Sequence, residues 1–291
     1  MSSLKALAPA KLNLSLQVFR PDSSGLHPIR GLTLSIGRCD ILTMESSGSD
    51  DLDIHGADLP EGQDNLVWKA VTELRRSLPT EHPRVRFDLR KRIPVAAGLA
   101  GGSSDAAAAL VLYAHLVGFD RSGLDALALE VGADVGFCLR GGFRWIGGYG
   151  EQLEERLDVG EGFVLVVAVP PFPISTPRVY AAWDGLGEPR GPAYGGAYLP
   201  PAIRPHGPLA NDLYPAAAAI APELDDWRSE LAHRWDRPVL MTGSGPSLFS
   251  FFSDQAEAEE ALLLVPAEAR SAFVAEPISH GVRLVNDGNQ V

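Results

Sequence analysis

The sequence predicts an α+β fold, because helices and strands are mixed along the chain without a regular strand–helix–strand repeat. Residues Lys11–Val18 alternate apolar and polar side chains, which is the period of a strand with one buried face. A glycine-rich loop at Pro94–Ser104 leads into an alanine-rich helix, and Phe163–Val169 is a continuous apolar strand closed by two prolines. A second half of the chain is expected to begin near Gly150–Arg156.

Each element follows from a local pattern. Runs of apolar or alternating residues predict strands at Lys11–Val18, Gly31–Met44, Val85–Leu89, Phe143–Ile146, Phe163–Val169, Val239–Met241 and Ser247–Phe252. Apolar residues at helical spacing predict helices at Asn65–Leu78, Asp105–Val117, Leu124–Val131, Ala210–Leu231 and Ala256–Leu264. Gly37–Arg38 is expected to form a turn, Pro189–Pro208 a surface loop, and Val274–Leu284 the closing segment.

Length and composition restrict the class of protein. The 291 residues are 45% hydrophobic, which is ample for a core, and no apolar run reaches the roughly 18 residues of a membrane span. The net charge is −12, and the sequence shows no basic patch or stripe of the kind that a nucleic-acid binder normally has. The richest basic stretch, Arg84–Arg92, leads into the glycine loop. Cys39 and Cys138 lack metal-ligand spacing and fit two thiols of a cytoplasmic protein.

The segment Pro94–Ser104 is the strongest local signal of a binding site. Three glycines fall within five positions, and glycine lets the backbone approach a ligand closely. Two serines and Asp105 are expected to open the next helix, with Asp105 as its N-cap, and a helix start favours a phosphate. The glycine-lysine pair of the common P-loop and the dinucleotide fingerprint are both missing. By itself the pattern fits equally well a glycine-rich turn that caps an ordinary helix.

Two further segments give this loop a context. Ala8–Leu14 contains Lys11 and Asn13, and Thr242–Ser247 reads Thr-Gly-Ser-Gly-Pro-Ser. With the glycine loop between them, these segments resemble the three motifs of the GHMP kinases, the superfamily of galactokinase, homoserine kinase, mevalonate kinase and phosphomevalonate kinase. The ordered triple is far more specific than one glycine loop. The resemblance implies a small-molecule kinase that uses ATP, with Mg²⁺ carried by the ATP.

Other segments resemble one branch of that family, which phosphorylates the 2-hydroxyl of 4-diphosphocytidyl-2-C-methyl-D-erythritol in the non-mevalonate isoprenoid pathway. They are Gly25–His27, Lys91–Pro94, Gly132–Val135, Gly148–Glu151, Pro171–Tyr180 and Asn211–Leu213. The resemblance runs from about Ala8 to Phe252. It implies a small-molecule partner that carries a cytidine diphosphate group, and neither a nucleic acid nor a membrane. The oligomeric state stays open.

The resemblance also implies a two-domain fold with the active site in the cleft between the domains. The N-terminal domain, residues 1–153, would resemble domain 2 of ribosomal protein S5 and hold the ATP-binding loop. The C-terminal domain, residues 154–291, would be ferredoxin-like.

The expected catalytic residues are Lys11 and Asp134. By position alone, Lys11 is a lysine on the polar face of a strand and Asp134 is a turn or cap residue. Within the family motifs, Lys11 would orient the acceptor hydroxyl and stabilise the transferring charge, and Asp134 would accept the hydroxyl proton. Whether Asp134 removes the proton early or mainly positions the hydroxyl stays open.

The resemblance assigns the binding residues as well. The ATP-binding residues would be Lys91, Pro94, Val95, Ala96, Ala97, Gly98, Leu99, Ala100, Gly101, Gly102, Ser103 and Ser104. The substrate-binding residues would be Asn13, Leu26, His27, Thr176, Tyr180 and Gly243. His27 would bond the cytosine edge, Tyr180 would stack on the base, and Gly243 would help the third motif pack against the phosphate loop. No side chain is assigned as a metal ligand.

The chain departs from the family pattern in four places. Leu26 stands where the family usually has an aromatic residue, and Ala96, Ala97 and Ala100 stand where it has more glycine. Asp105 stands where the family has asparagine, and Gly136 where it has proline. Asp105 is either the N-cap, which we favour, or a residue that meets the magnesium ion. Two alternatives follow. One is another GHMP kinase, of mevalonate or homoserine type, against which the Gly-Leu-His27 and Pro171–Tyr180 segments argue. The other is a non-catalytic sensor of the same fold, against which Lys11 and Asp134 argue.

Overall fold

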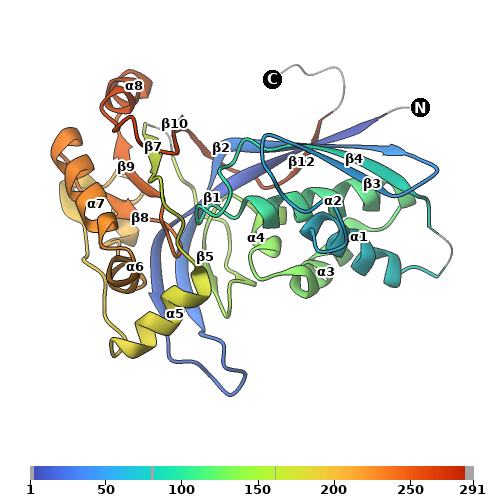
Figure 1. Ribbon diagram of the computed structural model, residues 1–291, viewed down its shortest axis with the longest axis horizontal. Helices are drawn as coiled ribbons and strands as arrows, with labels where there is room; N and C mark the ends of the chain where they lie inside the picture. Colours follow the sequence, from blue (N-terminus) through green and yellow to red (C-terminus); the bar gives the residue numbers. More distant parts are fainter. Residues whose placement is uncertain (1–2, 80–81, 161, 286–291) are drawn as a thin grey trace.

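Two β-sheets form the centre of the computed structural model, which describes residues 3–79, 82–160 and 162–285 (Figure 1). The first sheet has the strand order β12–β1–β2–β4–β3, with β5 and β11 also paired to β2, and β6 paired to β5. Its strands are β1 (Leu4–Val18), β2 (Ile29–Ser46), β3 (Asp51–His55), β4 (Val85–Arg90), β5 (Phe143–Gly147), β6 (Gln152–Leu153), β11 (Pro277–Ile278) and β12 (Arg283–Val285). All of these pairs are antiparallel except β3 with β4.

The second sheet is antiparallel, with the order β10–β7–β9–β8. Its strands are β7 (Val164–Val169), β8 (Leu240–Met241), β9 (Leu248–Phe252) and β10 (Ser271–Ala275). The α-helices are α1 (Leu66–Arg76), α2 (Gly101–Val117), α3 (Leu124–Val131), α4 (Val135–Arg140), α5 (Thr176–Gly185), α6 (Tyr214–Ile220), α7 (Glu223–Trp235) and α8 (Gln255–Leu263). Short 3₁₀ helices lie at Arg121–Gly123, Gly196–Tyr198 and Arg204–His206.

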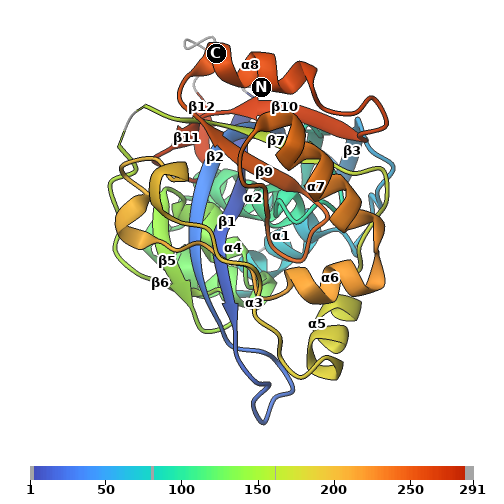
Figure 2. The same ribbon diagram turned by 90° about the vertical axis from the view of Figure 1, so that its left-hand side faces the viewer.

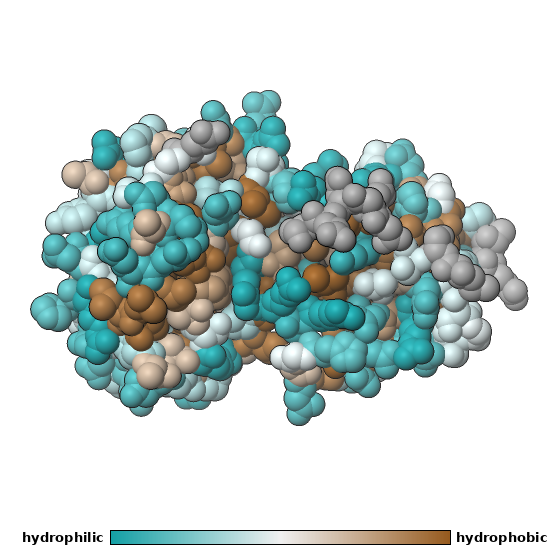
Figure 3. Space-filling model, turned by 90° about the horizontal axis from the view of Figure 1, so that it is seen from above, coloured by the Kyte–Doolittle hydropathy of each residue, from teal (hydrophilic) through white to brown (hydrophobic). Residues whose placement is uncertain are grey.

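Three buried clusters arrange these elements in layers. In the first, α1, α2 and α3 cover one end of the first sheet, with residues such as Val71, Phe87 and Leu110. In the second, the two sheets pack on each other through residues such as Leu12 and Phe249. In the third, α5 to α8 cover the outer face of the second sheet. The space-filling view shows two lobes joined by a narrower waist (Figure 3). Burying apolar side chains in all three layers is the main stabilising term of such a fold.

The first strand, β1, runs through both lobes. Apolar residues of β1 pack under the helices at one end and between the sheets further along, as Ala8 and Leu12 do. The alternation of Lys11–Val18 predicted one buried face only, but Lys11 and Asn13 on the opposite face are 6% and 3% exposed. That face is covered too, because the segment after β8 packs against it.

Several predicted boundaries were wrong, for local reasons. Gly37–Arg38 is not a turn: β2 continues through it with a bulge, where Pro9 pairs with Cys39 and Ala10 with Ile36. The helix predicted at Ala210–Leu231 is two helices, α6 and α7, separated at Ala221–Pro222 because proline cannot continue a helix. The sequence patterns also missed α4, α5 and β3.

The two halves of the chain are not two separate sheets. After β10, the chain returns to the first sheet, where β11 pairs with β2 and β12 pairs with β1. The division into residues 1–153 and 154–291 stays a prediction, and its outer ends, residues 1–2 and 286–291, lie outside the described residues. Within the described part of the chain, no helix is both long and apolar enough to cross a membrane.

Candidate active site

Lys11 lies at the centre of a group of polar residues between the lobes. Its ammonium Nζ donates to Asn13 Oδ1 at 2.6 Å and lies 3.6 Å from Asp134 Oδ2. The side chain of Lys11 is 7% exposed and that of Asp134 is 37% exposed. The cation is therefore held inside the protein, and the carboxylate beside it is partly open to solvent. This is an arrangement in which a hydroxyl can reach the carboxylate while the ammonium lies nearby.

Asp134 owes its position to the short connection between α3 and α4. The chain leaves α3 at Gly132 and enters α4 at Val135, so Asp134 is the N-cap residue of α4. Its carboxylate makes no capping hydrogen bond and is available to Lys11. Its charge also reaches Tyr180: burial, and then the negative charge of Asp134, raise the pKa of the Tyr180 hydroxyl to about 12.

The glycine loop packs against the third motif. A Cβ on Gly98, which has φ +75°, would lie 2.7 Å from the carbonyl oxygen of Thr242, and Ser247 Oγ donates to the carbonyl oxygen of Ala97 at 2.6 Å. The Thr242 hydroxyl accepts the backbone N–H of Asn13 at 2.7 Å, and Gly243 lies near Gly98. The three motifs, far apart in the sequence, are thus in direct contact.

The helix after the loop begins earlier than predicted. It starts at Gly101, and its N-cap is Ala100 with φ +56°, so Asp105 is not the cap and lies one turn inside the helix. Ser104 is fully buried and its hydroxyl donates to the carbonyl oxygen of Pro9 at 2.8 Å. The first amides of a helix have no intrahelical acceptor, and Gly102 at this end is exposed. The Ser104 hydroxyl is therefore taken up by Pro9, and the donors left at this end of α2 include its first backbone N–H groups.

Lys91 lies behind the loop. Its side chain is 3% exposed, and its ammonium binds the carboxylates of Asp40 and Asp105. Burial alone would lower the pKa of Lys91, but the two carboxylates raise it above the usual value. Burial raises the pKa of Asp105 to about 8, with the Asp40 charge adding to the rise and Lys91 opposing it. The predicted contact between Lys91 and a nucleotide stays a prediction, and the ammonium is bound by the two carboxylates in this structure.

Four of the predicted substrate residues lie at the other end of the group, where the loop between β1 and β2 extends beside α5 (Figures 1 and 2). They are Leu26, His27, Thr176 and Tyr180, whereas Asn13 and Gly243 lie beside Lys11 and Gly98. The His27 ring lies 4.9 Å from the Tyr180 ring, and its Nε2 lies 2.9 Å from Asp184 Oδ1. Thr176 at the start of α5 shares a hydrogen bond of 2.6 Å with Ser244. Leu26, beside His27, is 56% exposed.

Sequence reasoning missed four residues of this region. Asp184 and Ser244 contact His27 and Thr176. Asp40 is 0% exposed, and the Asn211 amide group donates to the carbonyl oxygens of Met241 and Gly243 at 2.8 Å. Ser244 and Asn211 fall inside segments that had been singled out, but Asp40 and Asp184 carry no local pattern that distinguishes them.

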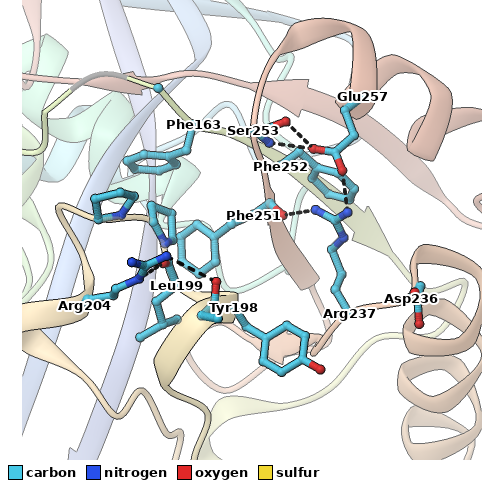
Figure 4. A pocket seen from close by; sticks show the side chains of 14 residues that line it. Phe163, Tyr198, Leu199, Arg204, Asp236, Arg237, Phe251, Phe252, Ser253 and Glu257 are labelled. Carbon is cyan, nitrogen blue, oxygen red and sulfur yellow. Dashed lines mark hydrogen bonds and ion pairs between the residues drawn. The ribbon is translucent and has the colours of Figure 1, made fainter.

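A hollow of about 370 Å³ lies on the C-terminal lobe (Figure 4). Its Arg237 donates to Glu257 Oε1 at 2.5 Å and to the carbonyl oxygen of Phe251 at 2.7 Å. These two charged side chains pair with each other, and none of the predicted site residues lines this hollow.

Comparison with known proteins identifies the family. The model of the GHMP kinases N-terminal domain matches residues 65–142, and the model of the GHMP kinases C-terminal domain matches residues 202–269. The chain belongs to the GHMP kinase family. It is therefore a small-molecule kinase, and the predicted α+β, two-domain GHMP fold is confirmed. Kinases of this family use ATP.

Individual relatives are similar over nearly their whole length. A Pelotomaculum thermopropionicum protein named 4-diphosphocytidyl-2-C-methyl-D-erythritol kinase is 37% identical over 268 residues, which are 88% of this chain and 92% of the relative. A protein of the same name from Azorhizobium caulinodans is 37% identical over 283 residues, covering 92% and 96%.

Solved structures of kinases share the fold of this chain. A crystal structure of 4-(cytidine 5'-diphospho)-2C-methyl-D-erythritol kinase has a TM-score of 0.75 and 31% identity, covering 95% of this GHMP kinase and 100% of that chain. A homoserine kinase from Cytophaga hutchinsonii has a TM-score of 0.71 at 17% identity, covering 98% of each chain, and so shares the fold.

Proposed function

We propose that this GHMP kinase transfers the γ-phosphoryl group of ATP to the 2-hydroxyl of 4-diphosphocytidyl-2-C-methyl-D-erythritol, a step of the non-mevalonate isoprenoid pathway. The observation that supports it most is 37% identity over 92–96% of relatives that carry the name of that kinase. The contact between Lys11 and Asp134 supports an active kinase rather than a sensor.

The proposed reaction uses the two lobes together. The ATP phosphates would lie at the start of α2, where free backbone N–H groups and the helix dipole favour negative charge. The acceptor hydroxyl would donate a hydrogen bond to Asp134, which would take its proton as the oxygen attacks the γ-phosphorus. The bond between that phosphorus and the β–γ bridging oxygen would break, and ADP would leave. Lys11, held by Asn13, would stabilise the charge that develops on the transferring group.

Mg²⁺ would reach this site on the ATP phosphates. The described residues hold no cluster of three or more side chains of the types that bind metals, and the Asp105 carboxylate is enclosed against Lys91. In the bound state the ion would neutralise phosphate charge.

The substrate base would lie against His27 and Tyr180. Nε2 of His27 contacts Asp184, which leaves Nδ1 of the ring for a ligand. An aromatic ring such as that of Tyr180 can stack on any base, so a hydrogen bond from His27 would provide the selectivity for cytosine. Thr176 and Gly243 would lie along the remainder of the substrate.

Cytoplasmic location and the absence of a nucleic-acid partner belong to the same proposal. They are supported by the two free thiols, Cys39 and Cys138, and by the net charge of −12.

A steady-state assay of ADP release tests the proposal. The acceptors are 4-diphosphocytidyl-2-C-methyl-D-erythritol, its analogue without cytidine, mevalonate and homoserine. We expect kcat/KM to be highest for the first by at least about 100-fold, because a site built for a polar base rejects ligands that lack it. A higher kcat/KM for mevalonate or homoserine would show that this compound is the acceptor instead. ATP binding without ADP release in the presence of any of the four acceptors would favour a ligand sensor.

A further inference from the structure

A buried ion cluster lies behind the glycine loop and takes no part in the proposed reaction. It consists of Asp40 on β2, Lys91 just after β4, and Asp105 on α2. Their side chains are 0%, 3% and 4% exposed. The three residues come from three elements that meet where the loop Pro94–Ser104 begins and ends. Their arrangement therefore bears on how that loop is held.

Asp40 fixes the chain that enters the loop. Its Oδ1 accepts the backbone N–H groups of Arg92 at 2.5 Å and of Ile93 at 2.8 Å, while its Oδ2 binds the ammonium of Lys91. One carboxylate of the sheet thus holds three donors from consecutive residues. Charge-assisted hydrogen bonds of this kind are stronger than neutral ones.

Lys91 continues the link to the helix. Its ammonium donates to Asp105 Oδ2 at 2.5 Å, and a Cβ placed on Gly101 would lie 3.3 Å from the same nitrogen. Its backbone N–H donates to the carbonyl oxygen of His55 at 2.8 Å, so the residue is fixed at both ends. The ammonium therefore lies against the first turn of α2, on the side away from solvent.

We propose that Lys91 is a positioning residue for the phosphate loop: it joins Asp40 on β2 to Asp105 on α2 without touching the nucleotide. The ammonium would have to leave two buried carboxylates to reach a phosphate, and separating a buried ion pair is strongly unfavourable. Held in place, it sets the distance between the loop entrance and the helix start. That the bound anion is ATP rests on the proposed function. The contacts among Asp40, Lys91 and Asp105 are observed without any ligand and do not rest on it.

The Asp105 carboxylate offers a matched control. Its Oδ1 is buried without a hydrogen-bond partner, while its Oδ2 binds Lys91. In Asp105→Asn, the side-chain amide oxygen can keep the hydrogen bond from Lys91, and the amide NH₂ takes the place of the unpartnered Oδ1. Lys91→Met/Asp105→Asn removes the ammonium without leaving two carboxylates to repel each other.

Hydrogen exchange without any ligand tests the positioning role. Circular dichroism and a thermal scan first establish that each variant is folded. We expect the amides of Ile93 and of Ala106–Ala108 to exchange at least about tenfold faster in the double variant than in Asp105→Asn, because local opening becomes easier. We also expect a several-fold higher KM for ATP, with the KM of the acceptor unchanged. Unchanged exchange together with weaker ADP binding would overturn the proposal in favour of a direct contact.

Asp40→Asn keeps the test decisive should the double variant not fold. This variant retains Lys91. The amide NH₂ of the new asparagine either faces the Lys91 ammonium or replaces the oxygen that accepts the backbone N–H groups of Arg92 and Ile93. Positioning predicts faster exchange at Ile93 and weaker ADP binding, whereas a direct contact predicts ADP binding equal to or tighter than in the wild type. Because exchange is measured without substrate, failure of the proposed acceptor would leave this result standing.

Discussion

The ammonium of Lys11 lies 3.6 Å from the carboxylate of Asp134, and the two residues are 123 positions apart in the sequence. Lys11 is held from the other side by Asn13 at 2.6 Å. One cation thus connects the first strand to the start of α4. In the proposed reaction, this contact would bring the base and the charge-stabilising group together.

Lys11→Met and Asp134→Asn are each expected to lower kcat by at least about 100-fold, the range for a positioned charge-stabilising or proton-transfer group. Steady-state ADP release measures this. Lys5→Met, on the same strand but away from the site, is the control and should keep wild-type kcat. Near-wild-type turnover in either site variant would remove the role assigned to that residue.

Leu26→Tyr is expected to lower the KM of the cytidine-containing acceptor. Leu26 is 56% exposed next to His27, and an aromatic ring there could stack on a base that Tyr180 contacts from the other side. The gain should be several-fold, since base–aromatic stacking contributes about 1–3 kcal/mol in other proteins. The KM of the cytidine-free analogue serves as the control. Equal effects on both acceptors would show that position 26 does not face the base.

Ala100→Gly is expected to raise the free energy of unfolding by about 1 kcal/mol, because an L-residue in the left-handed region costs about 1–2 kcal/mol. Ala100 has φ +56° at the start of α2. Urea unfolding measures the change. Ala106→Gly, inside the same helix, should have the opposite sign, which separates the conformational effect from the loss of a methyl group. A destabilised Ala100→Gly protein would contradict this account.

Asp105→Asn is expected to become more stable than the wild type as the pH rises from 5 to 8. Burial raises the pKa of Asp105 to about 8 in the folded state, from 3.8 for an ordinary aspartate. A group with a raised folded pKa contributes most stability below its unfolded pKa and loses it as the pH rises through the folded pKa. The difference in unfolding free energy should grow by about 1 kcal/mol or more between pH 5 and pH 7 and level off above pH 8.

The exposed carboxylate of Asp53, paired with Arg86 on the surface, provides the comparison for this pH series. Asp53→Asn should show a nearly constant difference from the wild type over the same range, because exposed ion pairs contribute little. A flat difference for Asp105→Asn as well would mean that Asp105 is ionised throughout and that Lys91 fully compensates it.

The sequence predicted a feature correctly where that feature depends on residues that are neighbours along the chain. Periodicity predicted the strand at Lys11–Val18, the helix at Leu124–Val131 and the end of the α2 helix at Val117, and the structure confirms them. The three motifs were readable for the same reason, since each is a short segment whose residue types and spacing suit phosphate or hydroxyl binding.

The sequence by itself determined the family, the phosphate loop and the catalytic pair that we propose, because these are carried by contiguous motifs. Only the tertiary structure decided what each polar group contacts. It placed Lys91 between Asp40 and Asp105, gave His27 to Asp184, and enclosed the Ser104 hydroxyl against Pro9. Those partners lie on other elements, and the cost of burying an unpaired charge or hydroxyl selects them only once the layers have packed.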